Sequence, residues 1–132
     1  MFFNDERLIS IIKDAPNGSE LKIFLFIALN QPQDGIRGFR STKIQLSIDL
    51  NLKLATIFKS LKWLEDNLLV QELKMTDDFD FMVNPVFVMN NSDKNERFAE
   101  WNRRCNLDSA RELRLRKDRR IRQRRLEKKQ KN

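Results

Sequence analysis

Histidine and tyrosine are absent from this 132-residue sequence. Without histidine the chain has no imidazole base that titrates near neutral pH, and it lacks a usual ligand of zinc sites. Without tyrosine it cannot carry the tyrosine nucleophile that some DNA-nicking proteins use. The glycines, Gly18, Gly35 and Gly38, do not form a GxxxxGK[ST] phosphate-binding loop. These absences predict a protein that is not an enzyme and that holds no metal or cofactor.

Cysteine, proline and long apolar runs are also scarce. The single cysteine, Cys105, excludes an intramolecular disulfide bond. The N-terminal residues Met1 to Glu6 do not resemble a signal peptide. The longest apolar run, Ile23 to Leu29, is far shorter than the ~20 residues that span a bilayer. We therefore expect a cytoplasmic protein with no membrane partner.

Positive charge is concentrated in the C-terminal part of the chain. Residues 1–92 contain 10 Lys and Arg against 12 Asp and Glu, whereas residues 93–132 contain 16 against 7. A basic block favours a polyanionic partner, either nucleic acid or an anionic membrane surface, and nucleic acid is the preferred interpretation. The acidic group Asp77, Asp78 and Asp80 could hold Mg²⁺, but its position between two strand-like runs favours a turn.

Two helices are predicted before residue 31. The first covers residues 6–13, and the second covers residues 20–30 with Ser19 as its N-cap. The second contains the run LKIFLFIAL, which is apolar nearly all round and is typical of a helix at the centre of a core. A short strand is predicted at residues 36–40.

A helix-turn-helix motif is predicted next. Its first helix, residues 43–49, begins with Thr42 and Gln45 as a capping-box pair. After a brief turn, a longer helix covers residues 53–67. This helix repeats apolar residues at intervals of three and four, which predicts one face against the core. The residues on that face are Ile57, Leu61, Leu64 and Leu68.

A β-hairpin is predicted directly after this motif. Residues 69–75 and 79–83 alternate roughly between apolar and polar, and Asn84-Pro85 ends the second strand because proline cannot donate a ladder hydrogen bond. A hairpin behind a helix-turn-helix is the wing of a winged helix. We therefore predict a mainly α protein with a small β-hairpin. A winged helix-turn-helix DNA-binding domain would cover residues 1–92, and a basic helical or partly disordered tail residues 93–132.

The candidate DNA-binding residues lie in both parts. A recognition helix reads base edges in the major groove with its N-terminal residues, so Lys53, Ala55, Thr56 and Lys59 are expected near bases and Lys62 at phosphate. Lys43 and Lys74 are further candidate phosphate contacts, and Ser41 and Thr42 can present hydroxyl and backbone N–H groups to a phosphate. The candidate phosphate-binding residues of the tail are Arg111, Arg114, Arg116, Lys117, Arg119, Arg120, Arg122, Arg124 and Arg125.

Two segments resemble RepL-type plasmid replication proteins. The stretch from Thr42 to Leu69 is similar to their TxxELA…TVxxxLKxLEExxxI run, and Phe81 to Met89, around Asn84-Pro85, resembles their NP signature after the wing. Gly18 to Ile23 is also similar to the start of their second helix. The resemblance implies a protein that binds origin DNA and leaves the chemistry to host enzymes. The chain departs from the family in its basic end, Arg103 to Lys131, and in its acidic wing tip.

Three functions remain open at this point. The first is initiation or control of plasmid replication through double-stranded DNA at an origin, with host replication proteins as candidate further partners. The second is a transcriptional or copy-number repressor with the same fold, bound to an operator. The third is an interaction adaptor whose basic tail binds RNA or an acidic partner. A homodimer is compatible with each of them.

Overall fold

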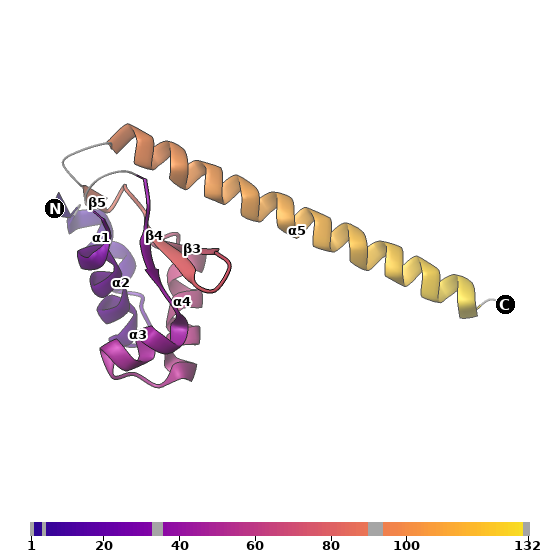
Figure 1. The fold of residues 1–132 in the computed structure, drawn as a ribbon, viewed down its shortest axis with the longest axis horizontal. Coiled ribbons are helices and arrows are strands. Elements are labelled where there is room, and N and C mark those ends of the chain that lie inside the picture. Colours follow the sequence, from indigo (N-terminus) through magenta and orange to yellow (C-terminus); the bar gives the residue numbers. More distant parts are fainter. Residues whose placement is uncertain (1, 4, 33–35, 90–93, 131–132) are drawn as a thin grey trace. The chain divides into compact units, whose positions relative to one another are not determined.

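The computed structural model describes residues 2–3, 5–32, 36–89 and 94–130, and for residues 2, 3, 5, 7, 89, 94, 108–119 and 130 it describes the backbone alone. Its elements in chain order are β1 (Phe2–Phe3), α1 (Asp5–Ile12), α2 (Ser19–Asn30), β2 (Phe39–Ser41), α3 (Lys43–Leu50), α4 (Leu54–Asp66), β3 (Val70–Lys74), β4 (Phe79–Val83), β5 (Val88–Met89) and α5 (Lys94–Gln130) (Figure 1). The chain forms two compact units, residues 1–101 and residues 102–132.

An antiparallel sheet of three strands forms the wing, in the order β2-β4-β3. The predicted hairpin of β3 and β4 is confirmed, with Val70 opposite Val83 and Lys74 opposite Phe79. The short strand expected at residues 36–40 starts later, at Phe39, and pairs with β4 as the third strand. The helices α1 to α4, with β2 between α2 and α3 and the β3–β4 hairpin after α4, make the first unit a winged helix, as the sequence predicted.

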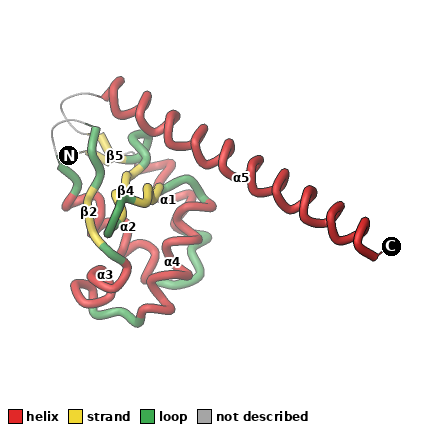
Figure 2. The backbone as a smooth tube through the Cα atoms, turned by 45° about the vertical axis from the view of Figure 1, so that its right-hand side comes forward, coloured by secondary structure: helices red, strands yellow, loops and turns green. Residues whose placement is uncertain are grey.

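The core of the first unit lies between α2, α4 and the sheet (Figure 2). Ile23, Phe24 and Ile27 of α2 are completely buried, which confirms that this apolar helix occupies the centre. Phe81 of β4 is buried against the same cluster. Burying such side chains stabilises the fold by about 1.5–3 kcal/mol each. The core thereby fixes α4 in place through one face and leaves the opposite face to solvent.

The start of α2 differs from the prediction. Ser19 is the first residue of the helix instead of its N-cap, and the capping residue Gly18 makes no side-chain cap hydrogen bond. The backbone N–H of Asn17 instead donates to Oε2 of Glu20 at 3.2 Å. The Ser19 hydroxyl lies 2.9 Å from the hydroxyl of Ser60, which is buried on α4. Ser19 therefore joins two helices, a role that depends on a residue 41 positions away.

A second sheet, which the sequence analysis did not predict, pairs β1 with β5 antiparallel. Phe2 lies opposite Met89, and Phe3 lies opposite Val88. Each strand has only two residues, so neither shows the alternation by which strands are recognised in a sequence.

The helix α5 begins within the first unit, which extends to Trp101. Arg97 is buried, and its guanidinium donates a hydrogen bond to the carbonyl oxygen of Pro32. Trp101, one turn further, is also buried. Trp101 thus belongs to the first unit, and the predicted tail is a helix through Gln130. In the described part of the chain, none of the helices combines the length and apolar character needed to cross a bilayer.

Candidate nucleic-acid interface

The turn between α3 and α4 is closed by backbone hydrogen bonds. Asn51 adopts a left-handed conformation with φ 52°. Its N–H donates to the carbonyl of Ile48, and the N–H of Leu52 donates to the carbonyl of Ser47 at 3.1 Å. These two bonds form a Schellman motif, which asparagine tolerates better than most residues. The turn ends α3 sharply and allows α4 to begin at Leu54.

The N-terminus of α3 is capped as half of a capping box. Thr42 Oγ1 accepts a hydrogen bond from the N–H of Gln45 at 3.0 Å, as predicted. The reciprocal contact from the Gln45 side chain is not formed, because that side chain donates instead to Asp49 Oδ1 at 2.8 Å. Thr42 is thereby occupied in holding the first turn of α3.

The inner face of α4 agrees with the prediction at three of four positions. Ile57, Leu61 and Leu64 are buried in the core. The prediction for Leu68 is wrong, since this residue is 56% exposed. The helix ends at Asp66, and Leu68 takes a left-handed conformation with φ 58°. The 3.6-residue periodicity therefore stops before it reaches Leu68.

The Asn84-Pro85 segment stabilises this exit from α4. The side-chain amide of Asn84 donates to the carbonyl of Leu68 at 2.8 Å, and its backbone N–H donates to the carbonyl of Leu69 at 2.9 Å. Its side-chain oxygen accepts the N–H of Val86 at 3.0 Å. These contacts hold a leucine in a conformation that β-carbon sterics disfavour by about 1–2 kcal/mol. The NP signature thus has a structural role in this chain.

Helix α4 and its N-cap carry five of the nine residues predicted to bind DNA in the winged helix. Lys53, at the N-cap, and Ala55, Lys59 and Lys62 are exposed. Thr56 is half-buried. Trp63 is also half-buried and packs against the core, as expected for a tryptophan engaged by neighbouring helices.

Two residues predicted as phosphate contacts are engaged inside the first unit. The Lys43 ammonium lies 3.2 Å from Oε1 of Glu72 and sits over the rings of Phe58 and Phe79, at 4.6 and 4.9 Å. The Ser41 side chain is buried, and its hydroxyl donates to the carbonyl of Thr42. We therefore leave Lys43 and Ser41 out of the interface proposed below.

The acidic residues of the wing are bound within the sheet. Asp78 accepts hydrogen bonds from Arg40, and the two form an ion pair at 2.6 Å. The hydrogen bond from Arg40 lowers the pKa of the Asp78 carboxyl, and the same bond raises the pKa of Arg40. Asp80 is buried and accepts the backbone N–H of Gly38 at 2.9 Å. A β-carbon at Gly38 would lie 2.3 Å from that carboxylate, so only glycine fits there. Among the described residues, no three acidic or cysteine side chains are grouped to hold a metal ion.

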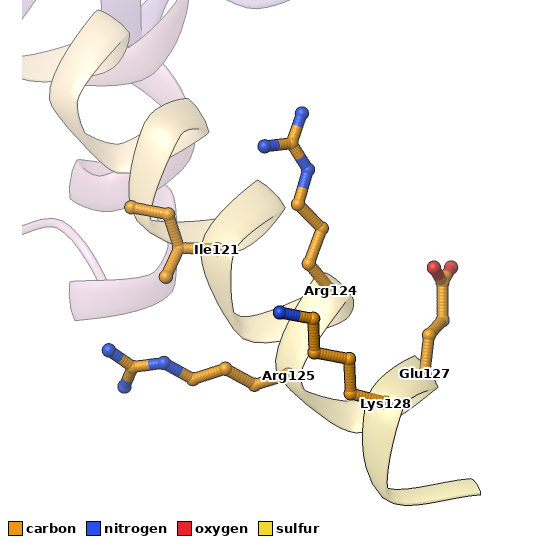
Figure 3. A pocket seen from close by; sticks show the side chains of 5 residues that line it. All are labelled: Ile121, Arg124, Arg125, Glu127 and Lys128. Carbon is orange, nitrogen blue, oxygen red and sulfur yellow. The ribbon is translucent and has the colours of Figure 1, made fainter. Parts of the chain in front are cut away.

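Lys74, at the end of β3, is exposed. In the second unit, the side chains of Arg120, Arg122, Arg124 and Arg125 are exposed as well. Arg124, Arg125 and Lys128 line one open hollow together with Ile121 and Glu127 (Figure 3). The other candidates of the tail, Arg111, Arg114, Arg116, Lys117 and Arg119, lie outside the side chains that the structure describes.

The sequence analysis did not identify three exposed residues of the first unit, Arg40, Leu54 and Phe58. Arg40 pairs across the sheet with Asp78, 38 positions away, and no local pattern indicates that contact. Leu54 and Phe58 are hydrophobic residues of the predicted helix, yet they are 40% and 49% exposed. At about 100° per residue, Phe58 lies a quarter turn away from Ile57, which is a signal that it stands at the border of the buried face.

Comparison with known proteins gives similarity in fold only. No protein-family model and no curated protein match the sequence. One similar solved structure is a transcriptional regulator homologue from Pyrococcus horikoshii OT3, with 18% identity and a TM-score of 0.44 over 83% of this chain and 97% of that one. Another is described as a possible transcriptional regulator from Methanosarcina mazei Go1, with 17% identity and a TM-score of 0.44 over 89% of this chain and 94% of that one. The fold assignment therefore rests on the elements and their packing.

Proposed function

We propose that this chain is a sequence-specific DNA-binding protein that places the first turns of α4 in the major groove of double-stranded DNA. The observation that carries the proposal is the pair of exposed lysines on α4, Lys59 and Lys62, opposite the buried face of a helix-turn-helix, with the exposed Lys53 at the N-cap of the same helix. Helices of this class read base edges with their N-terminal residues. Lysines that neutralise phosphates also release condensed counterions from the DNA, and this release favours binding.

The second unit would supply affinity. Residues 1–92 have slightly more acidic than basic side chains, so the winged helix has little attraction for DNA by net charge. The exposed cations at the end of α5 compensate for this deficit. Phosphate contacts carry no base information, so in this proposal α5 strengthens binding to every sequence and α4 chooses among sequences.

The finer proposal is that the DNA is the replication origin of a small plasmid. Its support is the resemblance of Thr42 to Leu69 and of Phe81 to Met89 to RepL-type replication proteins. The structural role of Asn84 would suit a repressor at an operator equally well. A plasmid that carries only this gene and its flanking DNA distinguishes the two roles: an initiator lets it replicate, whereas a repressor does not.

The DNA-binding proposal is tested by selecting duplexes from a randomised library with the full chain and measuring affinity by fluorescence anisotropy. Lys59→Ala should weaken binding to the selected duplex by about 1–3 kcal/mol and relax preference at one position if Lys59 reads a base. Lys13→Ala, which removes an exposed lysine outside α4, is the matched control and should change neither quantity. Equal binding by the Lys59 and Lys13 variants would remove α4 from the interface.

A further inference from the structure

One flank of the exposed face of α4 is apolar. Leu54 and Phe58 are one helical turn apart and are 40% and 49% exposed, although both are large hydrophobic residues. This flank is the one next to the wing. The Lys43 ammonium stacks on the Phe58 ring and on the Phe79 ring of β4, and further along the flank Glu65 accepts the N–H of Glu72 in β3 at 3.3 Å.

The polar side chains of α4 offer few ways to identify a base. The helix sequence LATIFKSLKWLED contains no arginine, asparagine or glutamine. In the major groove, asparagine or glutamine makes the bidentate contact to adenine, and arginine or lysine makes the bidentate contact to guanine. The first two turns present Lys53 and Lys59 as long donors, whereas Thr56 is half-buried. Hydrogen bonds from these lysines can therefore identify guanine, whereas α4 offers no bidentate side chain for adenine.

The apolar group that the major groove offers is the C5 methyl of thymine. Leu54 and Phe58 stand beside lysines that contact DNA in the proposed function, so an apolar contact and a charge contact can form on the same helix. A second copy of this chain is a poor occupant of this surface. Lys53, Lys59 and Lys62 would then face the same lysines of the other copy, and like charges repel. A polyanion that carries apolar groups satisfies both halves of this surface.

We propose that α4 selects its DNA through contact of Leu54 and Phe58 with thymine methyl groups in the major groove. This inference rests on the proposed function and adds the base that is read. The target is then a duplex with thymines on the strand segment facing the first two turns of α4. Cytosine presents an amino group and no methyl there, so it would leave the Leu54 and Phe58 side chains without an apolar partner.

The test replaces each thymine of the selected duplex in turn by deoxyuridine, which removes the methyl group and keeps base pairing. With the full wild-type chain, deoxyuridine at a contacted position should weaken binding about fourfold, equivalent to ~0.8 kcal/mol for one buried methyl-sized group. Leu54→Ala and Phe58→Ala should each abolish that ratio at one position. Lys59→Ala is the control, which should weaken binding to both duplexes and leave the ratio unchanged.

The outcomes separate the inference from the proposed function. A library that yields no enriched duplex overturns sequence-specific binding itself. An enriched duplex whose affinity is insensitive to deoxyuridine at every position overturns the inference and leaves the function standing. Sensitivity that persists in both alanine variants assigns the methyl contact to other residues and also overturns the inference. A wild-type chain that is insensitive to deoxyuridine overturns the inference even if an alanine variant is unstable.

Discussion

Neutralising three cations on one side of α5 should change how DNA binding depends on salt. Arg124, Arg125 and Lys128 are exposed and line the same hollow of the helix surface (Figure 3). The triple variant R124Q/R125Q/K128Q removes their charges and keeps the helix, since glutamine is about as good a helix former as lysine or arginine. The variant therefore tests charge without shortening the chain.

The size of the effect follows from the geometry of the helix. At about 100° per residue, Arg124 and Arg125 lie about 100° apart around the helix axis. Lys128 lies between them, about 40° from Arg124. An arc of this width can face one duplex, so all three cations can meet phosphates together. Each neutralised phosphate contributes about −0.9 to the slope of log affinity against log salt concentration. The slope should therefore become flatter by about 2.7 units, and preference for the selected duplex should persist.

The assay is a fluorescence-anisotropy titration of wild type and variant on selected and scrambled duplexes, from about 50 to 200 mM salt. Glu127→Gln is the matched control, because it makes a similar side-chain change beside the same hollow and removes no positive charge. Its slope should stay close to that of wild type. An unchanged slope in the triple variant would show that these side chains do not reach phosphate, and the tail would then be assigned to RNA or to an acidic protein.

Two further predictions concern the wing and its stability. Gly38→Ala should destabilise the fold by about 1–3 kcal/mol, because the new β-carbon would collide with the carboxylate of Asp80 and with the backbone carbonyl of Phe81. Gly18→Ala, with open space around it, should cost less in the same urea titration, since it loses only the preference of an N-cap for glycine over alanine. Equal effects would show that the contact at Gly38 relaxes freely. Asp78→Asn should cause a small loss of stability at pH 7, and this loss should disappear as the pH falls. Folding lowers the pKa of the Asp78 carboxyl, so the carboxylate stabilises the fold above its unfolded pKa of about 3.9. This stabilisation is lost once the carboxyl is protonated in the folded state. A pH series of denaturation curves checks this, and a loss that is the same at every pH would contradict the ion pair as its cause.

The sequence predicted those parts of the fold that local patterns determine. The helix-turn-helix follows from apolar spacing and from Thr42 as a cap, and the hairpin follows from alternation around a turn. The elements that it missed depend on contacts between distant residues. The strand Phe2–Phe3 exists because Val88–Met89 lies beside it, and Leu68 leaves the core because Asn84 binds its carbonyl. No window of neighbouring residues contains either contact.

The candidate interface was predictable to the same extent. The exposure of Lys59 and Lys62 follows from their position opposite Ile57 on a helix, which the sequence alone specifies. The contact of Lys43 with Glu72 does not follow from the sequence, because Glu72 is 29 positions away on a strand. The exposure of Phe58 could not be predicted for a related reason. Hydrophobic residues are buried on average, and whether a residue at the border of a helix face is buried depends on which neighbours pack beside it.

The acidic sequence of the wing tip does not produce an acidic wing surface. Asp80 is buried and accepts a backbone N–H from the residue that precedes β2. The charge of Asp78 is balanced by Arg40, and the two other exposed charges near the tip, Lys74 and Asp77, have opposite signs. Opposite charges therefore partly offset one another at the wing, and Arg40 and Lys74 leave no net positive charge there to attract a phosphate. In the proposed function this leaves the attraction of phosphate to α5 and the choice of bases to α4, so a substitution in α5 alters affinity for every duplex and a substitution in α4 alters the order among them.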